Sequence, residues 1–127
     1  MAAKSKIKVI FIDKVTKEVT KKVIDYDWEH MKSMIGTSII EAVRILDYPL
    51  TYVLCDENGR LQEEENKKYT QIHIGPSIVF EGNLMLVGAS GDEFDDCLVK
   101  LEDLIDKIEF KGDDYIDPPL DIQFIGG

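Results

Sequence analysis

The chain has 127 residues, of which 44% are hydrophobic and 31% charged, which is enough for one domain with a buried core. No apolar stretch approaches the roughly 18 residues that a membrane-spanning helix needs, and the short charged lead does not fit a signal peptide. We therefore expect a cytoplasmic protein without membrane contact. The formal net charge of −10 creates a field that opposes direct nucleic-acid binding and favours basic partners.

Charge is distributed unevenly along the chain. Residues 1–32 contain eight lysines and five acidic residues, whereas residues 92–127 contain three lysines and twelve acidic residues. The acidic C-terminal third suits either a solvated face or a surface that docks on a basic protein. The candidate residues of such a docking surface are Asp92, Asp95, Asp96, Asp113, Asp114 and Asp117.

Residues 6–13 and 18–26 predict a first β-hairpin. Ile7, Val9 and Phe11 alternate with lysines in the first segment, and further isoleucines give it the apolar content of a buried strand. A polar stretch between the two segments supplies the turn.

A helical period follows the hairpin. Trp28, Met31 and Ile35 fall on one stripe of a short amphipathic helix. Asp27 is placed to cap its N-terminus, and Gly36 is placed to end it.

Residues 37–46 fit either a strand or a further helical turn. We favour a strand, because the segment is rich in β-branched residues and a glycine has just ended the helix. The next strand, residues 52–55, leads into Asn58-Gly59, a dipeptide typical of hairpin turns, and resumes at Arg60.

Residues 71–82 and 83–90 predict two more strands. Gly75 and Pro76 interrupt the first one, so we interpret it as a single bent strand with a bulge or at a sheet edge.

Apolar residues recur at helical spacing in residues 92–111, and Ser90 with Glu93 fits a capping box. We expect a C-terminal helix there. The alternative starts the helix near Lys100 and makes residues 93–98 a last short strand.

These elements together predict an α+β domain with a mostly antiparallel sheet, one short helix after the first hairpin and one C-terminal helix. The domain spans residues 1–111. Residues 112–127 contain two prolines and no helical period. We expect an extended tail that lies along the surface or binds a partner.

The chain offers few residues for metal or thiol chemistry. Cys55 and Cys97 lie far apart, and in a cytoplasmic chain we expect reduced, at least partly buried thiols. Their apolar and acidic surroundings raise a thiol pKa, which disfavours catalysis by either. His30 and His73 are the only histidines and form no metal-binding spacing with the cysteines, so we expect neither a metal nor a cofactor.

The stretch HIGPSIVFEG, residues 73–82, suggests at first a catalytic His–Ser pair or a phosphate-binding turn. Ser77 does not sit in a G-x-S-x-G elbow, and no lysine or helix follows as in a phosphate-binding loop. The polar residues can still line a ligand pocket if basic side chains converge on them. The candidate ligand-binding residues are Arg44, Arg60, Tyr69, His73, Gly75 and Ser77.

Three segments, IKVIFID, VLCDENGRL and IHIGPSIVFEGNLMLVGASGDEF, give the chain a family resemblance. In order and spacing, they resemble a family of small domains of unknown function from bacteriophages and other mobile elements. The matching positions are Glu57, Gly59 and Leu61 in a hairpin, and Ile74, Gly75 and Val79 in a strand. The resemblance covers residues 6–110, although QEEENKKY replaces the family's asparagine- and proline-rich stretch, and it supplies no catalytic residues.

The resemblance implies a phage-type protein that acts in the host cytoplasm, where small non-enzymatic proteins often counter host defences. We expect a homo-oligomer that captures a small nucleotide-like ligand carrying a defence signal. The alternative is an acidic inhibitor that mimics nucleic acid or blocks a basic host protein.

Overall fold

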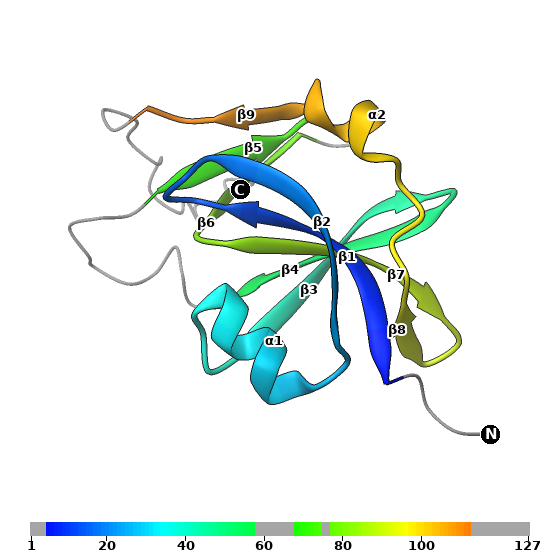
Figure 1. Cartoon of the computed structure of the whole chain (residues 1–127). Helices are drawn as coiled ribbons and strands as arrows, with labels where there is room; N and C mark the ends of the chain where they lie inside the picture. The colour runs from blue at the N-terminus through cyan, green and yellow to red at the C-terminus, as the bar shows by residue number, and fades with distance from the viewer. Residues whose placement is uncertain (1–4, 58–67, 75–76, 113–127) are drawn as a thin grey trace, which may run out of the picture.

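Two antiparallel β-sheets and two helices make up the part of the chain that the computed structural model describes, residues 5–57, 68–74 and 77–112 (Figure 1). The larger sheet has the strand order β2-β1-β7-β4-β3, with β8 paired to β7, and the smaller sheet has the order β6-β5-β9. The predicted α+β class with mostly antiparallel pairing is confirmed. The larger sheet contains β1 (Lys6–Asp13), β2 (Glu18–Asp25), β3 (Ile40–Asp47), β4 (Leu50–Asp56), β7 (Leu84–Ser90) and β8 (Glu93–Asp95). The smaller sheet contains β5 (Tyr69–Ile72), β6 (Ile78–Glu81) and β9 (Ile108–Phe110), and the helices are α1 (Trp28–Ile35) and α2 (Leu101–Ile105).

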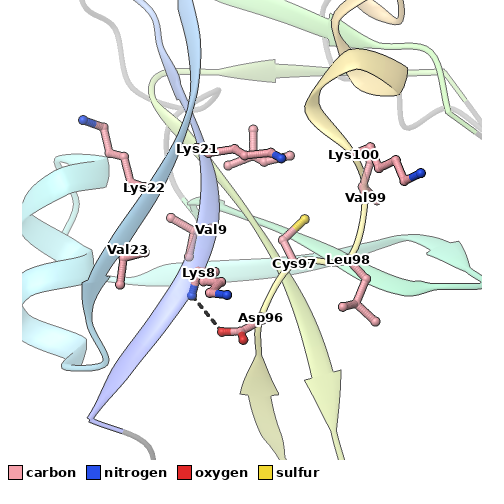
Figure 2. A pocket seen from close by; sticks show the side chains of 11 residues that line it. Lys8, Val9, Lys21, Lys22, Val23, Asp96, Cys97, Leu98, Val99 and Lys100 are labelled. Carbon is pink, nitrogen blue, oxygen red and sulfur yellow. Dashed lines mark hydrogen bonds between the residues drawn. The ribbon is translucent and has the colours of Figure 1, made fainter.

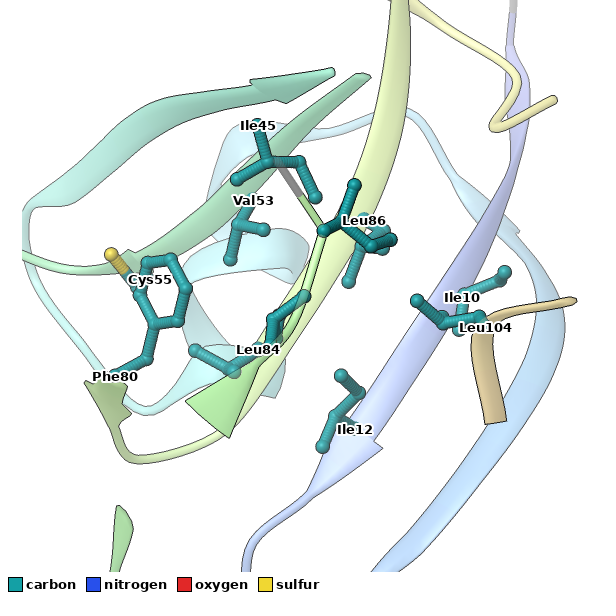
Figure 3. Packing of buried hydrophobic residues seen from close by; sticks show 11 residues of the cluster. Ile10, Ile12, Ile45, Val53, Cys55, Phe80, Leu84, Leu86 and Leu104 are labelled. Carbon is teal, nitrogen blue, oxygen red and sulfur yellow. The ribbon is translucent and has the colours of Figure 1, made fainter. Parts of the chain in front are cut away.

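The larger sheet is buried on both faces because its central strands carry apolar residues at successive positions. In β1, Ile7, Val9 and Phe11 pack into a cluster with α1, while Ile10 and Ile12 pack into a cluster with the smaller sheet. The sheet therefore lies between α1 on one side and the smaller sheet with α2 on the other (Figure 1). Figure 3 shows the second of these clusters, in which β1, β4 and β7 meet α2.

Helix α1 begins and ends where the sequence predicts. The Asp27 carboxylate accepts a hydrogen bond from the His30 backbone N–H at 3.0 Å. Gly36 adopts the left-handed conformation, with φ of 84°, and its N–H bonds the carbonyl of Lys32. Met31 and Ile35 are buried against the sheet. The first hairpin and the strand at residues 40–47 are confirmed as well, whereas the Asn58-Gly59 turn lies outside the described residues.

The stretch interpreted as one bent strand at residues 71–82 is two strands. β5 ends at Ile72 and β6 begins at Ile78, and the two pair antiparallel. Mutual pairing satisfies the backbone groups on one edge of each short strand, and β9 pairs with the other edge of β5. The expected bulge at Gly75-Pro76 lies outside the described residues.

The predicted C-terminal helix is confirmed as α2, but it is shorter than residues 92–111, and the alternative, with a helix near Lys100 after a short strand, describes the chain. Ser90 pairs with Glu93 in a β7–β8 hairpin, so the two residues form no capping box. The helix starts only after Lys100 and stops at Ile105, because the residues beyond it join β5 as β9. No helix among the described residues is long and apolar enough to cross a membrane.

Candidate functional site: a lysine-lined groove

A groove of about 390 Å³ lies between the first hairpin and the segment that connects β8 to α2 (Figure 2). One wall comes from β1 and β2, and the other comes from residues 96–100. Its lining residues are Lys8, Val9, Ile10, Lys21, Lys22, Val23, Asp96, Cys97, Leu98, Val99 and Lys100.

The register of the first hairpin places two of the lysines together. Lys8 pairs with Val23 and Ile10 pairs with Lys21, and cross-strand partners project to the same face of a sheet. Lys8 and Lys21 therefore share the groove face with Ile10 between them. Lys22 belongs to the opposite face by strand alternation, and in Figure 2 its side chain points away from Cys97.

Residues 96 and 97 hold the second wall against β1. The Asp96 carboxylate accepts a hydrogen bond from the Lys8 backbone N–H at 2.8 Å. The Cys97 N–H donates to the Lys8 carbonyl, also at 2.8 Å. This wall runs so close to β7 that a Cβ on Gly88 would lie 2.3 Å from the Asp96 carbonyl oxygen. Only glycine fits at position 88, so the groove depends on this close approach.

The groove combines cationic rims with apolar surface. The ammonium groups of Lys8, Lys21 and Lys100 form no ion pair with another described residue. Val23 and Leu98 leave 64% and 69% of their surface exposed beside them. Exposed apolar side chains next to unpaired cations suit a ligand that is anionic at one part and apolar at another.

Cys97 lines this groove, yet its thiol is a poor nucleophile. Burial raises its pKa, and a backbone hydrogen bond at Val99 and the charge of Lys21 offset only part of that rise. Burial, with the nearby Glu41 and Asp56 carboxylates, raises the pKa of Cys55 to about 12. Both cysteines are free thiols, as the sequence predicts, and both are mostly protonated at neutral pH.

The sequence-predicted pair His73 and Ser77 does come together, across the β5–β6 connection. His73 Nδ1 lies 3.1 Å from Ser77 Oγ, and His73 Nε2 lies 3.0 Å from Glu109 Oε1. Hydrogen bonds and charge from Lys111 and then from His73 hold the pKa of the Glu109 carboxyl below its usual value. The His73 and Glu109 side chains remain 41% and 52% exposed. Water therefore competes for these contacts, and their evident role is to join the connection to β9.

Of the other predicted ligand-binding residues, the structure describes Arg44 and Tyr69. Arg44 lies on β3 of the larger sheet, where its guanidinium contacts Asp47 at 2.7 Å. Tyr69 lies on β5, opposite Glu81 of β6. Arg60 and Gly75 lie outside the described residues.

The predicted acidic docking surface is only partly described. Asp92 is exposed in the turn between β7 and β8. Asp95 accepts a hydrogen bond from the Asp96 backbone N–H at 2.8 Å, and Asp96 itself holds Lys8. Two of the described carboxylates thus serve the fold. The remaining candidates, Asp113, Asp114 and Asp117, lie outside the described residues.

Another, smaller pocket of about 140 Å³ lies between β3, β4 and β6, and both acidic and apolar side chains line it. Glu81 at its edge approaches Lys14 Nζ at 3.9 Å. Within the part of the chain that is described, no three His, Cys, Asp or Glu side chains stand close enough to hold a metal ion.

Fold and site define a two-sheet α+β domain with a basic, partly apolar groove at the edge of its larger sheet. The chain belongs to the DUF3846 family, a domain of unknown function, whose model matches residues 7–109. No curated protein and no solved structure matches the chain significantly. The family match includes both walls of the groove, from Lys8 to Lys100.

Proposed function

We propose that this domain binds a small anionic ligand of the nucleotide-like class in the lysine-lined groove and holds it without converting it. The observation that carries the proposal is that Lys8, Lys21 and Lys100 all line one groove of a chain with a net charge of −10. In an acidic protein, such a local group of cations stands out from the surface field.

The groove fits the two parts of such a ligand. Lysine ammonium groups are established phosphate binders and act as point charges. The aliphatic surface of Val23, Leu98 and Val99 offers area for the less polar part of the ligand. The raised pKa of Cys97 supports a binding role over thiol catalysis.

The biological setting of the proposal comes from the resemblance of the sequence to phage and mobile-element domains. In that setting, capture of a nucleotide signal would withdraw it from a host defence system. Binding by sequestration needs no catalytic group, only a protein concentration above the dissociation constant.

Thermal unfolding with a panel of cyclic and linear nucleotides, and with inorganic phosphate as reference, tests the proposal. A nucleotide that binds only the folded chain raises the Tm, and the stabilisation grows with the logarithm of one plus the ratio of its concentration to its dissociation constant. Lys21→Gln should raise the dissociation constant about tenfold, since it removes one charge-assisted contact. Lys107→Gln, an exposed lysine that does not line the groove, is the matched control and should leave binding unchanged.

The outcome that would overturn the proposal is a panel in which no nucleotide raises the Tm. Equal loss of binding in the Lys21→Gln and Lys107→Gln variants would place binding outside the groove.

A further inference from the structure

We propose that the C-terminal segment of the same chain, residues 113–127, binds in the lysine-lined groove and competes there with the anionic ligand. The inference rests on the proposed function for its consequence, regulation of ligand binding. The groove supplies the docking surface, where Lys8, Lys21 and Lys100, which form no ion pair with a described residue, lie near exposed Val23 and Leu98 (Figure 2).

The chemistry of the segment is complementary to that of the groove. Its sequence, DDYIDPPLDIQFIGG, contains four aspartates and no lysine or arginine. Large apolar residues stand between and after these aspartates: Tyr115, Ile116, Leu120, Ile122, Phe124 and Ile125. The carboxylates of the segment can pair with the groove lysines while its apolar side chains cover the exposed aliphatic surface. The proposed ligand combines an anionic and an apolar part in the same way.

The segment is long enough to reach the groove of its own chain. Lys100, in the groove wall, precedes α2, and β9 follows α2 and ends two residues before Gly112. Helix α2 and strand β9 have a combined length of about 18 Å. Fifteen extended residues span about 50 Å, which allows the chain to turn back past both elements.

The covalent link favours docking of the C-terminal segment in the groove of its own chain over docking of the same segment from a second molecule. A short tether gives an effective concentration of about a millimolar, which exceeds the working concentration of a second molecule. A tethered competitor also weakens the apparent affinity for the ligand by the fraction of chains whose groove is occupied.

Cys97 provides a readout that needs no ligand, because its thiol lines the groove (Figure 2). The experiment measures the rate of Cys97 alkylation by iodoacetamide in the full chain, by mass spectrometry, with buried Cys55 as internal reference. The test variant neutralises the segment with Asp113→Asn, Asp114→Asn, Asp117→Asn and Asp121→Asn. The control neutralises as many exposed carboxylates elsewhere, with Asp92→Asn, Glu102→Gln, Asp103→Asn and Asp106→Asn.

We expect the test variant to raise the alkylation rate of Cys97 about tenfold, since several exposed ion pairs are lost together. The control variant and the rate at Cys55 should stay unchanged. High salt should raise the Cys97 rate in the unmodified chain, because it screens the same pairs. The test variant should also bind the best nucleotide of the panel more tightly.

An unchanged Cys97 rate in the test variant overturns the inference. Protection that appears only as protein concentration rises would assign the groove to a second copy and would also overturn it. If no nucleotide binds but the Cys97 rate rises, the docking stands and the proposed function fails. If nucleotides bind equally well to the unmodified chain and to the test variant, and the alkylation rate of Cys97 is the same in both, the docking inference fails and the proposed function stands.

Discussion

The two sheets of this domain differ in the burial and the length of their strands. In β7, at the centre of the larger sheet, Leu84–Gly88 is buried without interruption. The three strands of the smaller sheet have four, four and three residues; β5 and β6 each bury two residues, and β9 buries none. We therefore expect the larger sheet to be the more stable part, and the smaller sheet, which covers one face of it, to open at lower free energy. One wall of the groove, β1 and β2, belongs to the larger sheet, and the other, residues 96–100, is joined to β1 by backbone contacts at Lys8.

A core truncation in each sheet tests this difference most strongly. Met85→Ala on β7 removes a fully buried side chain and should lower the free energy of unfolding by about 3 kcal/mol. Ile78→Ala on β6, where the side chain is only partly buried, should cost clearly less. Urea denaturation of the two variants measures both effects, and equal losses would contradict the contrast between the sheets.

The close approach at Gly88 gives the next largest effect. Gly88→Ala places a Cβ against the Asp96 carbonyl and should lower the free energy of unfolding by about 2 kcal/mol. Ala42→Val, on the exposed outer strand β3, should change it by less than about 0.5 kcal/mol. Because Gly88→Ala displaces the wall that carries Cys97, faster Cys97 alkylation should accompany the loss, and an unaltered alkylation rate would argue against this account.

The smaller sheet offers a stabilising substitution. Thr70 on β5 is fully buried, and its hydroxyl has no hydrogen-bond partner among the residues that the structure describes. Thr70→Val keeps the shape and removes the unpaired hydroxyl, which should raise the free energy of unfolding by about 1 kcal/mol. Thr70→Ser retains the hydroxyl and should bring no gain. A midpoint in urea that falls for Thr70→Val would show that the hydroxyl is satisfied.

The smallest expected effect is the acid dependence of the Glu109 contacts. Lys111 and His73 lower the pKa of Glu109 in the folded chain from its ordinary value of 4.5. The ionised carboxylate therefore stabilises the fold above pH 4.5, and this contribution disappears as the pH falls through the lower folded-state pKa. Glu109→Gln should be slightly less stable than the unmodified chain near neutral pH and equal to it in strong acid. Urea midpoints across that range measure the gap, and a gap that widens on acidification would have the wrong sign.

The sequence predicted correctly those helices and strands whose ends are set by residues nearby in the sequence, such as caps and turns. Asp27 and Gly36 mark the ends of α1, and the polar turn after Asp13 marks the first hairpin. The division of residues 71–82 into two strands was missed, because their pairing with each other and with β9 is not visible in an apolar stretch. For the same reason, the helical spacing of residues 92–111 suggested a long helix where pairing with β7 and β5 makes two strands.

The groove was missed because its charges come from separate parts of the chain. Lys8, Lys21 and Lys100 are far apart in sequence, and a net charge of −10 conceals their convergence. The register of the first hairpin is the signal that could have found half of the site, since it places Lys8 and Lys21 on one face. Residues 96–100 lie against β1 and β7 because of tertiary packing beside Gly88, and no pattern in the nearby sequence indicates this packing.

Two neighbouring lysines of the first hairpin have a consequence for self-association. Lys21 and Lys22 point to opposite faces of β2, which is the outer strand on its side of the larger sheet as described. Lysines on an outer strand discourage pairing with the same strand of another molecule. A variant that neutralises both would remove this protection together with a groove cation. If that variant binds nucleotides more weakly, its molecular mass in solution should be measured as well, because self-association would cover the same strand.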